Sequence, residues 1–195
     1  MKIIELIIDE EDVYGGIDAI SIVEHPAIEE DFVALNKQKE YKLQATDKDK
    51  KLLSGALLIP NKMIYRKERD EEYHIYFSRE TVRKASQMYL QKGNQNNATF
   101  EHEMPVQGLS LVESWIIDDK ENDKSNMYGM DLPLGTWFGT IKVNNDKIWN
   151  EFVKTGVVKG FSIEGYFSNK AELSQKEQKA DEIVEKLKSL FKKHR

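Results

Sequence analysis

Three side chains in the sequence have types that together suit nucleophilic catalysis: His102, Glu113 and Ser162. A serine hydroxyl becomes a nucleophile when an imidazole accepts its proton, and a carboxylate can hold that imidazole in place. The chain has no cysteine, which excludes disulfides, thiolate zinc sites, iron–sulfur clusters and a cysteine nucleophile. Covalent chemistry in this chain must therefore use oxygen or nitrogen.

His102 lies in a segment that we expect to be a strand. In a strand, Phe100, His102 and Met104 share one face, and Glu101 and Glu103 share the other. The imidazole then lies among apolar side chains and needs a hydrogen-bond partner. It is either a catalytic base or a core histidine that is bound to a backbone carbonyl. Both glutamates point away from it and no second histidine is near, which disfavours zinc. The sequence has no phosphate-loop, dinucleotide or EF-hand motif either, so we expect no metal and no cofactor.

Glu113 lies in a second expected strand, where it shares a face with the apolar Leu111 and Trp115. An isolated buried carboxylate is costly and takes up a proton unless it is paired. An imidazole in the next strand is a physically reasonable partner. The alternative is a different register, with Glu113 in solvent and Ser114 pointing inward.

Ser162 lies in a strand-like run between Gly160 and Gly165. Glycines lack a Cβ atom, so a ligand or another backbone can approach closely there. The spacing is Gly-x-Ser-x-x-Gly, which does not match the Gly-x-Ser-x-Gly elbow of α/β-hydrolases. Ser162 is therefore either a nucleophile or a strand serine at a bulge.

The elements that must position these residues are mostly short strands. Runs rich in Ile, Val, Leu, Tyr and Phe, each bounded by turn-forming or charged residues, predict strands. They cover residues 3–8, 17–23, 41–45, 52–59, 63–66, 73–77, 98–103, 109–117, 136–143 and 157–167. This pattern predicts an α+β fold with a mainly antiparallel sheet, a barrel or a sandwich, and flanking helices.

Helices are predicted in three places. Ser78 as an N-cap and Gly93 as a stop bound the first, and a cap at Asn144 or Asn145 begins the second. From Lys170 to Arg195 apolar residues recur every three or four positions, which predicts an amphipathic helix. We therefore expect a domain over residues 1–168 and a helical tail over 169–195, which either packs on the domain or binds a partner.

The composition narrows the function classes. The 29 Lys and Arg residues and the 34 Asp and Glu residues give a net charge of −5, which offers no general attraction to phosphates. The apolar start of the chain is too short for a signal sequence or a spanning helix. We therefore expect a cytoplasmic protein that binds neither a membrane nor specific nucleic acid.

The motifs, taken in order, resemble those of the phage prohead proteases, serine proteases of the XkdF type. Each motif is common by itself, whereas the ordered set is specific. The motifs are Glu101-His102-Glu103, Leu111-Val112-Glu113-Ser114-Trp115, Gly135-Thr136-Trp137-Phe138-Gly139, Ile148-Trp149, and Gly160-Phe161-Ser162-Ile163.

The resemblance implies an assemblin-like fold, related to the herpesvirus maturation proteases, and an endopeptidase acting inside the assembling prohead in the host cytoplasm. Its substrates would be the scaffold protein and the major capsid protein. The catalytic histidine of the family corresponds to His102 and its nucleophile to Ser162. Herpesvirus enzymes use a second histidine after the serine, but only His194 follows here, in the tail, so we choose Glu113 as the third residue.

Two other functions stay open at this point. The chain could be a noncatalytic prohead protein that uses the same fold and its tail to bind scaffold, or an unrelated β-rich binding domain. The resemblance also leaves open whether the chain forms a homo-oligomer.

Overall fold

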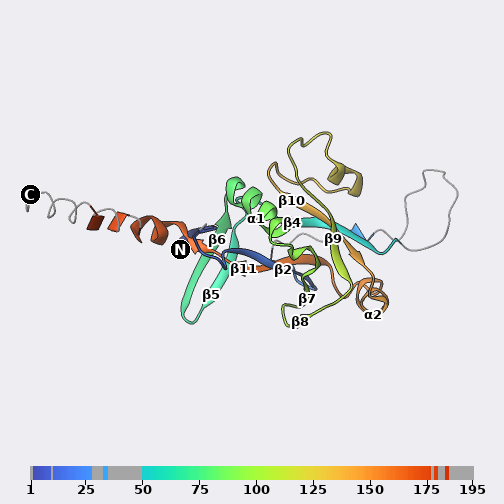
Figure 1. The fold of residues 1–195 in the computed structure, drawn as a ribbon. Helices are drawn as coiled ribbons and strands as arrows, with labels where there is room; N and C mark the ends of the chain where they lie inside the picture. Colours follow the sequence, from blue (N-terminus) through green and yellow to red (C-terminus); the bar gives the residue numbers. More distant parts are fainter. Residues whose placement is uncertain are drawn as a thin grey trace, which may run out of the picture.

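The computed structural model describes residues 2–9, 11–27, 33–34, 50–176, 178–179 and 183–184. These residues form an α+β fold with three small sheets, two of them mixed and one antiparallel (Figure 1). The α+β class is therefore confirmed. The strands of the described ranges form three open sheets and no closed barrel, so the prediction of a barrel is wrong.

The first sheet has the order β12-β1-β6-β5. Strand β1 (Lys2–Ile7) runs parallel to β6 (Glu71–Phe77), and β5 (Ile64–Glu68) forms a hairpin with β6. The short β12 (Ser168–Asn169) pairs antiparallel with β1. Residues 170–176 then begin a helix, where the tail helix was expected, and most of that expected helix lies outside the described residues.

The second sheet is antiparallel, with the order β3-β4-β10-β9. Its strands are β3 (Val33–Ala34), β4 (Leu52–Leu58), β10 (Trp137–Val143) and β9 (Leu109–Ile116). The strands expected at 52–59, 109–117 and 136–143 are confirmed here. The one expected at 41–45 lies outside the described residues.

The third sheet carries His102 and Ser162 and has the order β11-β2-β7-β8. Strand β2 (Gly16–Val23) pairs antiparallel with β11 (Gly160–Tyr166) and parallel with β7 (Ala98–Phe100). A hairpin joins β7 to β8 (Met104–Pro105). Strand β2 is therefore the central strand, with the nucleophile candidate on one side and the histidine segment on the other.

Two helical segments connect the sheets. Helix α1 (Arg79–Gln91) is capped by Ser78, whose hydroxyl accepts the N–H of Thr81, and it buries Val82, Ala85 and Tyr89. Helix α2 (Asp146–Ile148) is capped by Asn145 and continues as a wider helical turn over Trp149–Val153. Both helices lie where their caps and apolar spacing predicted them.

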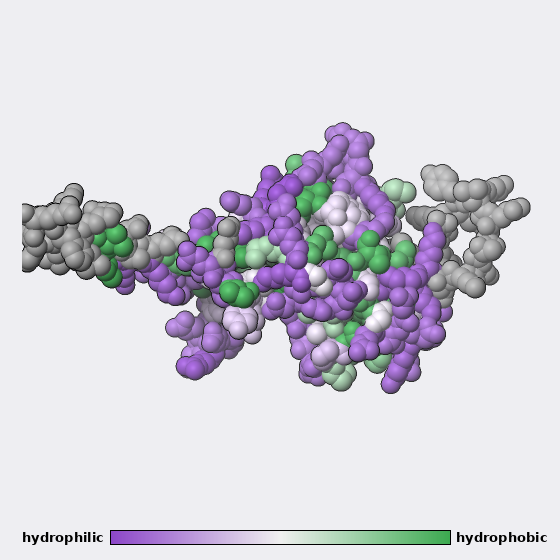
Figure 2. Space-filling view, in the orientation of Figure 1, coloured by the Kyte–Doolittle hydropathy of each residue, from purple (hydrophilic) through white to green (hydrophobic). Residues whose placement is uncertain are grey.

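The core lies between the sheets and these helices. Its largest fully buried side chains include Trp137, Trp149, Tyr89, Phe138 and Phe161. The ring of Tyr89 on α1 packs edge-on against Trp137 on β10, with ring centroids 5.6 Å apart. Figure 2 shows a mainly hydrophilic outer surface with hydrophobic residues grouped toward the middle of this face.

Candidate active site

His102 lies in the turn between β7 and β8, because β7 ends at Phe100. The strand expected over 98–103 is therefore wrong beyond Phe100. The backbone of Glu101 and His102 is left-handed, with φ values of 52° and 60°. Such a conformation costs a non-glycine residue about 1–2 kcal/mol. Contacts from neighbouring strands must therefore hold the turn.

The central strand β2 supplies those contacts. The N–H of Glu101 donates to the carbonyl of Ile22 at 3.2 Å, and the N–H of His102 donates to Oγ of Ser21 at 3.0 Å. The Ser21 hydroxyl donates in turn to the carbonyl of Thr99 at 3.4 Å, and Ser21 is fully buried. One buried hydroxyl therefore fastens the histidine turn to the middle of the sheet.

The imidazole of His102 is paired with Glu164 on β11. Its Nδ1 lies 3.1 Å from Oε1 of Glu164, close enough for an N–H···O bond. The Thr99 hydroxyl donates to the same carboxylate oxygen. The side chains of His102 and Glu164 are 42% and 31% exposed, so the imidazole lies at the surface. The expectation of an imidazole among apolar side chains on a strand face is therefore wrong.

Glu164 was not among the residues singled out from the sequence, although a signal for it was present. It follows Ser162 by two positions in a predicted strand, and residues two apart share a face. The histidine turn could not be read from the pattern, so the sequence did not show which face the imidazole would reach.

Ser162 lies in the same sheet and is only 9% exposed. It is directly opposite Ser21, which is directly opposite Thr99 on β7. Opposed residues in neighbouring strands point to the same face. The structure therefore places Ser162, Glu164 and the residues that hold His102 on one face of one sheet.

The structure shows no direct contact between the Ser162 hydroxyl and the His102 imidazole among its described hydrogen bonds. Glu164 engages Nδ1, so Nε2 is the imidazole nitrogen that is not bound to this carboxylate. Catalytic hydrogen bonds are often long or misaligned before substrate binds.

Glu113 has partners other than His102. Its carboxylate accepts two bonds from the ammonium of Lys124, at 2.6 and 2.7 Å, and one from the Thr140 hydroxyl at 2.7 Å. The hydrogen bond from Lys124, followed by that from Thr140, lowers the pKa of Glu113 below its ordinary value of 4.5. The carboxylate is thus satisfied within the β9–β10 sheet.

The expected register of the Glu113 strand is wrong, and a bulge explains why. In the β9–β10 pairing Thr140 is opposite Glu113 but the next residue of β10 is opposite Leu111, so Val112 is unpaired. The bulge turns Glu113 outward, 44% exposed, while Ser114 accepts the indole N–H of Trp137 at 2.9 Å. This is the alternative register considered above.

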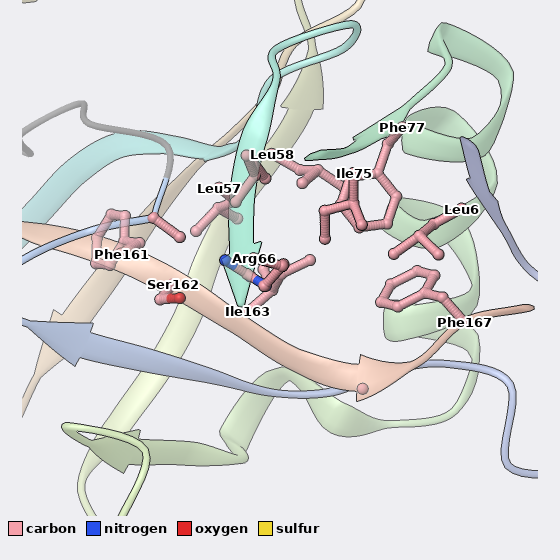
Figure 3. A pocket seen from close by; sticks show the side chains of 13 residues that line it. Leu6, Leu57, Leu58, Arg66, Ile75, Phe77, Phe161, Ser162, Ile163 and Phe167 are labelled. Atoms are coloured by element: carbon pink, nitrogen blue, oxygen red, sulfur yellow. The ribbon is translucent and has the colours of Figure 1, made fainter. Parts of the chain in front are cut away.

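A cavity of about 250 Å³ lies beside β11 and is lined in part by Ser162. Apolar side chains from β1, β4, β5, β6 and β11 form most of its wall, and Arg66 contributes the charged group. Figure 3 shows the labelled side chains of β4 and β6 on the side of β11 away from the blue strand β2, with Ser162 on β11 itself. The nucleophile candidate therefore borders this cavity.

In comparisons with known proteins, no family, no curated protein and no solved structure matches this chain. No helix in the described part of the chain has the length and apolar character needed to cross a bilayer. The described ranges also hold no group of three or more His, Asp and Glu side chains arranged to hold a metal ion.

We expect Ser21→Ala to loosen the histidine turn, because it removes the acceptor of the His102 N–H. The matched control is Ser54→Ala, which removes an equally buried hydroxyl that hydrogen-bonds Thr140 at 2.9 Å in another sheet. Each change costs about 1–2 kcal/mol of unfolding free energy. Only Ser21→Ala accelerates amide hydrogen exchange at His102, measured by NMR; equal exchange in the two variants would contradict the anchoring role.

The Glu113 pair predicts a pH dependence of stability. A carboxyl whose pKa is lowered by folding stabilises the fold above its ordinary pKa of 4.5, and that contribution fades as pH falls through the lower pKa of the folded state. Because the carboxylate is nearly half exposed, the effect stays below about 1 kcal/mol. In urea unfolding, the stability difference between wild type and Glu113→Gln should shrink from pH 7 toward pH 3. If the stability difference between wild type and Glu113→Gln does not change with pH, the predicted contribution of the Glu113 carboxylate is wrong.

Proposed function

We propose that this protein is a serine endopeptidase in which Ser162 is the nucleophile, His102 the general base and Glu164 the residue that orients the imidazole. The observation that carries the proposal is the 3.1 Å contact between Nδ1 of His102 and Oε1 of Glu164 on the face that holds Ser162. A histidine fixed at Nδ1 by a carboxylate presents Nε2 to a nucleophile.

The proposed reaction proceeds in two steps. Oγ of Ser162 attacks the carbonyl carbon of a peptide bond while Nε2 of His102 takes the hydroxyl proton. The tetrahedral intermediate collapses as the C–N bond breaks, and the same nitrogen returns the proton to the leaving amine. Water, activated by His102 in the same way, then hydrolyses the acyl ester and regenerates Ser162.

Glu164 and Thr99 have supporting roles in this proposal. The Glu164 carboxylate stabilises the positive charge that the imidazole carries after it accepts the proton. The Thr99 hydroxyl donates to the same carboxylate oxygen and so restrains its rotamer. Glu164 takes the place that Glu113 was given from the sequence, since Glu113 is bound to Lys124 instead.

We further propose that the biological role is prohead maturation, with the scaffold protein and the major capsid protein as substrates inside the host-cell prohead. The support for this role is the ordered set of sequence motifs together with an α+β fold. The assemblin-like topology, the helical tail over 169–195 as a separate unit and the absence of a cofactor belong to the same proposal.

One observation favours a second candidate, a noncatalytic prohead protein that binds scaffold. The His102, Glu164, Thr99 and Ser21 network is complete without Ser162, and no hydrogen bond joins the serine to the imidazole among the described residues. Such a network could serve only to fix the turn. The two functions differ in the reactivity of Ser162.

The test is covalent labelling by a fluorophosphonate, with peptide mapping, followed by cleavage assays with coexpressed scaffold and capsid proteins. We expect the label on Ser162 and no cleavage by Ser162→Ala, while Ser54→Ala, a change at another buried serine, keeps both. His102→Gln should lower kcat by about 10²- to 10⁴-fold. Unlabelled Ser162 with continued processing would overturn the proposal.

The paired variants Glu164→Gln and Glu113→Gln separate the two carboxylates in the same assay. Loss of the orienting carboxylate should lower kcat by about 10²- to 10⁴-fold in Glu164→Gln and leave it unchanged in Glu113→Gln. The opposite result would return the orienting role to Glu113.

A further inference from the structure

Strand β11 lies at the edge of its sheet. The order β11-β2-β7-β8 gives it β2 on one side, and no described strand pairs with its other side. Ser162 and Ile163 of β11 are among the residues that line the cavity (Figure 3). A strand edge without a hydrogen-bonded neighbour can accept an extended peptide as an additional strand through main-chain hydrogen bonds.

The cavity has the size and lining to receive one large apolar side chain from such a peptide. Its volume is about 250 Å³, and its wall includes Leu57, Ile64, Ile75, Phe77 and Phe167. An apolar cavity of about 150 Å³ already accepts a benzene ring. A branched aliphatic or aromatic side chain therefore fits, and burial of its surface contributes to binding.

Arg66 gives this cavity a positive charge, which favours a ligand that carries a negative charge. Arg66 comes from β5, at the edge of the first sheet, and it lines the cavity together with Ile163 of β11 (Figure 3). In the described part of the chain its guanidinium donates only to the carbonyl of Tyr65, at 3.1 Å, and no carboxylate pairs with it. A guanidinium with unused donors binds a carboxylate well.

We propose that this cavity is a subsite for an extended, acidic peptide segment that pairs with the edge of β11 to which no described strand is hydrogen-bonded, inserts a large aliphatic or aromatic side chain, and places a carboxylate on Arg66. The assignment of this peptide as a substrate rests on the proposed function. Binding itself does not require turnover, so the subsite can be tested with the nucleophile removed.

The experiment measures peptide binding to full-length Ser162→Ala by fluorescence anisotropy. The probes are labelled Gly-Ser peptides that carry one Phe and one Glu at spacings from one to four residues. Two matched sets replace Glu by Lys or Phe by Ala. We expect a Phe–Glu peptide to bind, each replacement to weaken it about fivefold or more, and the methyl NMR signals of Leu57 and Ile75 to shift on binding.

The variant Arg66→Glu should reverse the charge preference, so that the Lys set binds better than the Glu set. The control is Lys67→Glu, a neighbouring change of equal charge on the opposite face of β5, which should leave the preference unchanged. The subsite proposal is overturned if Arg66→Glu does not change the preference between the Glu and Lys peptide sets. It is also overturned if the methyl signals of Leu57 and Ile75 do not shift on binding.

The outcome is separable from that of the proposed function. If Ser162 is not labelled by a fluorophosphonate but the charge preference follows residue 66, the subsite stands as a peptide-binding site and the protease proposal fails. If Ser162 is labelled but the preference does not follow residue 66, the protease proposal stands and the subsite fails.

Discussion

The fixed position of the histidine turn is the constraint on which the rest of the site depends. Two consecutive non-glycine residues are left-handed there, and the Ser21 hydroxyl on β2 accepts the His102 N–H. Without that bond, fewer contacts would compensate the free-energy cost of the left-handed backbone conformation of the turn. Because β2 also pairs with β11, the same strand sets the position of His102 and of Ser162.

The bulges in the sheets decide which polar residues reach which partners. In β9 the unpaired Val112 sends Glu113 outward to Lys124. In β11 the register shifts between Glu164 and Gly165, where an added Cβ would lie 2.1 Å from the carbonyl oxygen of Gly16. A side chain at Gly165 would therefore push the two strands apart. Each carboxylate thus lies next to an irregularity of strand pairing in its own sheet.

Much of the secondary structure could be predicted from the sequence, because it rests on local signals. The Ser78 and Asn145 caps and the apolar runs of β2, β4 and β10 depend on near neighbours and are confirmed. The turn at His102 and the bulge at Val112 depend on partners far along the chain, such as Ser21 and Thr140. No local period reveals such partners, so the sequence pointed to Glu113 and not to Glu164.

The central claim is that the imidazole held by Glu164 acts on Ser162. The most direct measurement is a crystal structure of the protein after reaction with a peptide phosphonate. The account predicts phosphorus bonded to Oγ of Ser162, with Nε2 of His102 in hydrogen-bond contact with the adduct and Nδ1 still on Glu164. A phosphonate bonded elsewhere, or an imidazole turned away from the adduct, would contradict it.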